Sequence, residues 1–134
     1  MKTITFSKWQ DVLGRSLTAL AMLGALVAFF SGFKSINLAS PDRFWVESWR
    51  LAGFLLFAAM FALISLRPRQ SPGIWELAFF HKATMAFISL FIPFSQEATL
   101  AGTIDGILAL MLLSAYFLTR AWRGWRFPEQ STLG

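Results

Sequence analysis

Four ionisable side chains lie within otherwise apolar stretches of the chain: Glu76, His81, Lys82 and Asp105. A charged group in membrane hydrocarbon costs roughly 2.5–3.5 kcal/mol on insertion scales, so such residues are candidates for function. At a rise of about 1.5 Å per residue, Lys82 and Asp105 come within about 10 Å of each other in depth if their helices are antiparallel. Because the long Lys stem closes much of that gap, we expect the two side chains to face one another.

Two interpretations of these residues stay open. As a structural pair, Lys82 and Asp105 would fix the register of two helices. As members of a polar pocket with His81 and Glu76, they would bind a proton, an ion or the headgroup of a lipophilic ligand. His81 lies about 100° from Lys82 around a helix, so both can border one cavity without facing one point.

The sequence gives little support for a metal site or a catalytic site. A structural zinc site needs about four ligands, whereas the chain has no Cys and a single His. His81 also has no motif around it that would place it in a nucleophilic triad. We therefore expect no metal site and no catalytic residue, and lean against an enzyme.

The composition predicts a membrane protein. Of 134 residues, 56% are hydrophobic and 14% charged, against about 25% charged in soluble domains. A soluble chain this short leaves much of its surface exposed to solvent, so it cannot bury so much apolar area.

Four apolar blocks divide the chain, each close to the roughly 20 residues that a spanning helix needs. They lack the period-2 alternation of strands, and the connections between them are short, which favours antiparallel neighbours. We expect an all-α, up-down bundle of four transmembrane helices in one domain over 1–127, followed by a flexible tail at 128–134. The expected spans are about 8–33, 41–66, 72–94 and 96–122.

Helix-end signals support these spans. A serine stands at a potential N-cap before each one: Ser7, Ser40, Ser71 and Ser95. Gln10 completes a capping box with Ser7, and Pro93 is expected to help end the third helix.

Basic residues predict the orientation, because cytoplasmic loops are rich in Lys and Arg. One side has only Lys34, Arg43 and Arg50. The other has eight: Lys2, Lys8, Arg15, Arg67, Arg69, Arg120, Arg123 and Arg126. We expect both termini in the cytoplasm; a cleaved signal peptide over 1–39 is the alternative for the first span.

Tryptophans mark the expected membrane interfaces, which indole prefers: Trp9, Trp45, Trp49, Trp75, Trp122 and Trp125. The basic and aromatic run at 120–126 follows a span on the positive side. An anchor to the lipid bilayer explains it, and we expect no nucleic-acid partner.

Small residues recur at four-residue spacing, as Gly24 with Ala28 and as Gly102 with Gly106. Such strips let helix backbones approach closely. They predict packing within the bundle; docking in a homo-oligomer or against a larger membrane complex is the alternative.

Three motifs resemble the DoxX-like family of small four-helix membrane proteins. The first is Phe30-Ser31-Gly32-Phe33-Lys34, similar to the end of that family's first helix. The second is His81-Lys82-Ala-Thr-Met-Ala with Pro93 further on, similar to its third helix. The third is Glu97-x-x-x-x-Gly102-x-x-Asp105, similar to its fourth.

The resemblance implies a four-helix bundle in the bacterial cytoplasmic membrane, with Lys34, Lys82, Glu97 and Asp105 as the positions carried over. Some members of the family are linked to quinone-coupled redox complexes or act as accessory subunits, so quinone is the one cofactor to consider. We therefore expect a non-catalytic accessory subunit of a redox or envelope complex. The alternatives are a binding protein or small carrier for a quinone or isoprenoid, and, with less support, an ion or proton path.

Overall fold

The structure, a computed structural model, describes residues 7–126; the expected tail at 128–134 lies outside this range. These residues form helices and no strand, so the all-α prediction is confirmed. The elements are α1 (Lys8–Asn37), α2 (Pro41–Leu66), α3 (Ile74–Ser89), α4 (Gln96–Thr119) and a short 3₁₀ helix, η1 (Ala121–Trp125).

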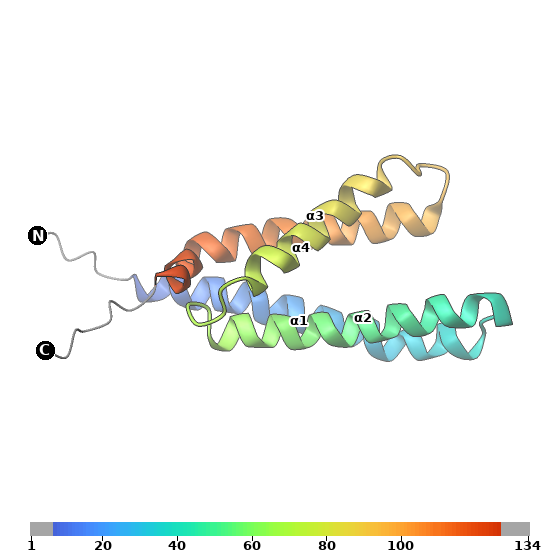
Figure 1. Cartoon of the computed structure of the whole chain (residues 1–134), viewed down its shortest axis with the longest axis horizontal. Coiled ribbons are helices and arrows are strands. Elements are labelled where there is room, and N and C mark those ends of the chain that lie inside the picture. Colours follow the sequence, from blue (N-terminus) through green and yellow to red (C-terminus); the bar gives the residue numbers. More distant parts are fainter. Residues whose placement is uncertain (1–6, 127–134) are drawn as a thin grey trace, which may run out of the picture.

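The helices form two antiparallel hairpins, α1–α2 and α3–α4 (Figure 1). The hairpins are joined mainly by α1 against α4, whereas α2 and α3 meet only briefly. Figure 1 shows the hairpins converging at the end that holds the α2–α3 loop and η1, and diverging toward the two hairpin turns. We call these the convergent and the divergent end. The up-down order of the helices is as predicted.

Within residues 7–126, three helices are long and apolar enough to cross a membrane: α1, α2 and α4, with mean hydropathies of 1.9, 1.9 and 1.7 over their most apolar stretches. The chain therefore has the helices of an integral membrane protein. The helix α3 has 16 residues, which at about 1.5 Å per residue is short of the roughly 30 Å of hydrocarbon.

The expected third span, 72–94, differs from α3 at both ends. Ser71 is not the N-cap; Gly73 is, with a φ of +87° that favours glycine. Its backbone N–H donates to Glu76 Oε2 at 2.9 Å. The helix ends at Ser89 because the following residues form tight turns, such as the bond from Ile92 N to Ser89 O at 3.1 Å, and Pro93 disfavours helical backbone just before it.

The ends of α1, α2 and α4 lie closer to their predicted positions. Ser95 caps α4, its Oγ accepting from Ala98 N at 3.2 Å. Ser7 and Ser40 occupy N-cap positions without a side-chain cap bond, so the capping box expected for Ser7 is wrong. α1 continues to Asn37 rather than 33. α4 stops at Thr119 rather than 122, because Arg120 adopts left-handed backbone with a φ of 53°.

The core is a cluster of aliphatic and aromatic side chains contributed by all four helices and η1: Ala21, Phe61, Ile64, Trp75, Ala78, Leu112, Ala115 and Ala121. Glycine allows the close approach of α1 and α4 beside it, because a Cβ on Gly14 would lie 2.6 Å from Thr119 Cγ2. By contrast, α1 contributes no buried residue after Ala21.

The predicted small-residue strips have different surroundings. A Cβ on Gly102 would lie 2.2 Å from Ser89 Cβ, and one on Gly106 would lie 3.7 Å from Ala86 Cβ. These glycines therefore pack α4 against α3, as predicted. Gly24 faces open space, with no atom within 4 Å of its added Cβ, so packing within the bundle is wrong for this residue.

Substituting Gly102 by Ala should destabilise the protein by about 1–3 kcal/mol, the usual cost of overpacking, because Ser89 and its backbone must move. The matched control is Gly106→Ala, which adds the same methyl group at ordinary contact distance and gains helix propensity. Reversible unfolding in detergent, followed by circular dichroism, measures both. Equal stability of the two variants would contradict the packing described.

Candidate functional site

The two side chains of opposite charge within the apolar stretches of α3 and α4 meet, as the sequence predicts. Lys82 Nζ on α3 donates to Asp105 Oδ1 on α4 at 2.8 Å. The two side chains are only 10% and 14% exposed. The same Nζ lies 4.1 Å from the ring centroid of Phe57 on α2, a cation–π distance. The pair therefore joins α3 to α4, and Lys82 also contacts the second hairpin.

His81 borders the same aromatic side chain from the surface. Its ring centroid is 4.8 Å from that of Phe57, yet the residue is exposed. His81 and Lys82 thus share a neighbour while facing different directions, as their spacing predicts.

Glu76 belongs to a different cluster, at the convergent end. Its Oε1 accepts from Tyr116 Oη at 2.9 Å and from Trp125 Nε1 at 2.8 Å. Together with the bond from Gly73 N, these contacts tie α3 to α4 and η1. The expectation that Glu76 shares a pocket with Lys82 is wrong, because Glu76 lies almost two turns earlier and is held by the helix ends.

Among the described residues, a cavity between α1 and α2 and a smaller one at the α2–α3 loop are each lined by residues other than Lys82, His81 and Asp105. A buried charge is tolerated when it is paired and hydrogen-bonded. The direct contact in the pair supplies this, so the geometry favours its structural interpretation over a ligand pocket.

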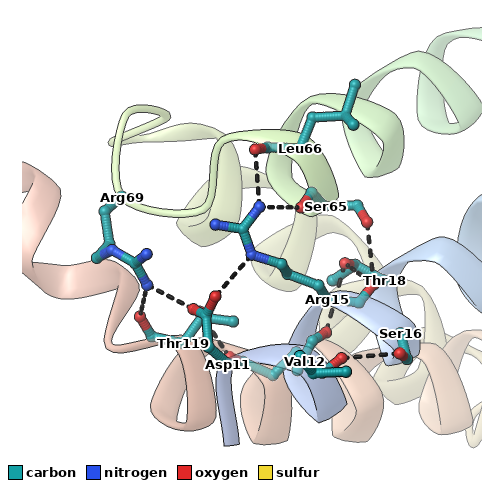
Figure 2. A network of polar contacts seen from close by, with 11 residues as sticks. Asp11, Val12, Arg15, Ser16, Thr18, Ser65, Leu66, Arg69 and Thr119 are labelled. Carbon is teal, nitrogen blue, oxygen red and sulfur yellow. Dashed lines mark hydrogen bonds and ion pairs between the residues drawn. The ribbon is translucent and has the colours of Figure 1, made fainter. Parts of the chain in front are cut away.

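A second network of charges holds the convergent end together (Figure 2). Asp11 on α1 accepts from Arg15 Nε at 2.8 Å and also pairs with Arg69 in the α2–α3 loop. Arg15 Nη1 donates to Leu66 O at 3.0 Å, and Arg69 Nη1 donates to Thr119 O at 2.9 Å. The two arginines thereby satisfy carbonyl groups at the C-terminal ends of α2 and α4, which lack helical partners.

Sequence reasoning counted Arg15 and Arg69 only as cytoplasmic charges and did not single out Asp11. The four-residue spacing of Asp11 and Arg15 is a usable signal for an ion pair along one helix. Nothing in the sequence indicates that Arg69 reaches the same carboxylate, because that contact depends on how α1 and the loop pack.

A third network lies at the divergent end and was also missed. Glu47 on α2 accepts from Arg43 Nη2 at 2.8 Å and from Arg50 Nη1 at 3.3 Å. Both arginines also pair with Glu97 on the first turn of α4. The residues link α2 to α4 where the hairpins diverge. The spacing of Arg43, Glu47 and Arg50 along one helix face was the available signal.

The tryptophans mostly lie on the surface, as expected of interface anchors. Trp9, Trp45 and Trp49 are well exposed, and Trp122 and Trp125 are exposed to a lesser degree. Trp75 corrects the prediction: it is 2% exposed and its Nε1 donates to Pro68 O at 2.9 Å. It packs in the core because the first turn of α3 faces Tyr116.

Comparisons with protein-family models, with curated proteins and with solved structures found no match to this chain. The DoxX-like resemblance therefore remains a prediction from the motifs.

Removing one member of the Lys82–Asp105 pair should leave an uncompensated buried charge. Lys82→Met and Asp105→Asn are each expected to cost about 3–5 kcal/mol. The double variant should cost far less than their sum, because both charges are gone. Unfolding in detergent measures the stability of the two single variants and of the double variant. Lys34→Met is the control for losing an exposed lysine. Additive losses would contradict a structural pair.

Proposed function

We propose that the chain is a non-catalytic accessory subunit of a membrane complex and that it acts by docking through its helix surface. The observation that carries this proposal is the open face at Gly24 on α1. Without a hydrophobic force between helices in lipid, association depends on close backbone approach at small residues. Gly24 offers such a position, and no part of its own bundle occupies it.

The neighbouring side chains support docking at this face. Leu23, Val27 and Phe30 are more than half exposed, and they lie near the glycine on the part of α1 that follows its last fully buried residue, Ala21. A glycine flanked by large side chains lets the backbone of a partner helix approach closely, while the large side chains pack along its sides. The Lys82–Asp105 contact also favours docking over ligand binding, because these two side chains are bonded to each other inside the bundle.

For the topology, we propose that α3 and the turns after it form a fourth span, with both termini in the cytoplasm of a bacterium. The apolar stretch continues to Phe94 beyond the last helical residue, Ser89. A short hydrophobic length is accommodated by local thinning of the bilayer. The convergent end carries Arg15, Arg67 and Arg69, which supports placing it inside by the positive-inside rule.

The kind of complex is proposed from the motifs alone. The resemblance to DoxX-like proteins favours a quinone-linked redox complex or an envelope complex. A carrier for a quinone or isoprenoid is the alternative, and it has less support because Lys82 and Asp105 contact each other directly.

Filling the open position should abolish docking. We expect Gly24→Leu to reduce a co-purifying membrane partner by about tenfold or more, corresponding to roughly 1.4 kcal/mol of binding energy. The matched control is Gly53→Leu on α2, where the same side chain also enters open space. Purification of the tagged chain in lipid discs, with quantitative mass spectrometry of the retained partner, measures both variants.

Two outcomes would contradict the proposal. One is a lone monomer in gentle lipid discs, with no stoichiometric partner. The other is a homodimer that contains no second kind of chain.

A further inference from the structure

A cavity of about 200 Å³ lies between α1 and α2 toward the divergent end. Its lining combines polar and apolar side chains, among them Ser31, Ser35, Glu47, Arg50, Leu51 and Phe54. It is smaller than the roughly 300–1,000 Å³ pockets that hold drug-sized ligands. The size therefore suits a headgroup better than a whole hydrophobic molecule.

The polar side of the cavity holds a carboxylate and a guanidinium next to each other. Glu47 is 8% exposed and is held in place by Arg43 and Arg50. A carboxylate has about four acceptor positions, and a guanidinium has five N–H donors. The bonds of Arg50 to Glu47 and Glu97 come from its two Nη atoms, so those contacts leave donors over, the Nε–H among them.

The apolar side of the cavity lies along the helices that would contact lipid. Ala28, Leu51 and Phe54 line it. Gly32 leaves room for the Leu51 side chain there, since an added Cβ would lie 2.7 Å from Leu51 Cδ1. An acyl chain leaving the cavity would therefore follow apolar surface between α1 and α2.

The depth of the cavity is that of a lipid headgroup. Glu47 and Arg50 alternate along α2 with Trp45 and Trp49, which are 78% and 70% exposed. Exposed tryptophans on membrane helices favour the interface between headgroups and hydrocarbon.

We propose that this cavity binds the headgroup of a zwitterionic phospholipid, with the phosphate on Arg50 and a primary ammonium on Glu47. Charge-assisted hydrogen bonds of this kind are the strong ones. An anionic lipid without an ammonium group matches less well, because it offers no cationic donor to the acceptor positions of Glu47 that the arginines leave open. The proposal does not depend on the chain being an accessory subunit.

The test uses the full chain, delipidated in detergent, and native mass spectrometry with added phospholipids. Phosphatidylethanolamine and phosphatidylglycerol of identical acyl chains are titrated separately. We expect the ethanolamine lipid to bind about tenfold more tightly, and Arg50→Gln and Glu47→Gln each to weaken it by about tenfold, the loss expected for one charge-assisted hydrogen bond. Arg67→Gln is the matched control, because it removes the same charge from an exposed arginine that neither lines the cavity nor pairs with Glu47.

A steric variant separates a loss of lipid binding from a loss of folding, which the charge variants could both cause. Ser31 is exposed and lines the cavity, so Ser31→Leu fills the site without removing a charge. It should weaken the ethanolamine lipid as much as Arg50→Gln does while leaving the thermal unfolding midpoint unchanged.

Three results would overturn the proposal. The first is equal binding of the two phospholipids to the unsubstituted chain. The second is unchanged ethanolamine-lipid binding in Arg50→Gln, Glu47→Gln and Ser31→Leu. The third is equally tight binding of water-soluble glycerophosphoethanolamine, which would assign the site to a free solute rather than to a lipid.

Discussion

A charged side chain can lie deep among apolar helices only when another group compensates its charge, and in this protein Asp105 does so for Lys82. The contact between Lys82 Nζ and Asp105 Oδ1 joins α3 to α4, and Phe57 extends it to α2. The helices α2 and α3 otherwise meet only briefly. The pair thus fixes the register within one hairpin and provides one of the few contacts of α3 with the other.

Polar networks at the two ends complete this arrangement. At the convergent end, arginines around Asp11 satisfy backbone carbonyls of α2 and α4 (Figure 2). At the divergent end, Glu97 ties the start of α4 to arginines of α2. Polar groups at the ends and apolar side chains between them match the layers of a bilayer, in which only the interfaces solvate charge readily. The proposed functions use an open face on α1 and a polar cavity between α1 and α2, and the cavity is lined in part by Glu47 and Arg50 of the divergent-end network.

Two kinds of feature were predictable from the sequence: those that depend on a single helix, and those that depend only on how far along its helix a residue lies. The bounds of α2 came out as expected because Pro41 begins the helix and polar residues follow Leu66. The Lys82–Asp105 contact followed from rise per residue and antiparallel order. The burial of Trp75, the grouping of Arg69 with Asp11 and the open surroundings of Gly24 were not predictable, because each depends on which helix faces turn toward one another. Glu76 was misplaced for a similar reason, since its cap bond to Gly73 and its contacts with Tyr116 and Trp125 hold it at the convergent end.

The central claim is that α3, with its paired lysine, crosses the membrane beside α4. Cysteine labelling tests it directly, because the chain contains no native cysteine. Gln70→Cys precedes α3 and Phe94→Cys follows it, both at exposed positions. We predict that a membrane-impermeant thiol reagent labels Phe94→Cys in intact cells and labels Gln70→Cys only after the membrane is permeabilised. Labelling of both positions from the same side would contradict the account.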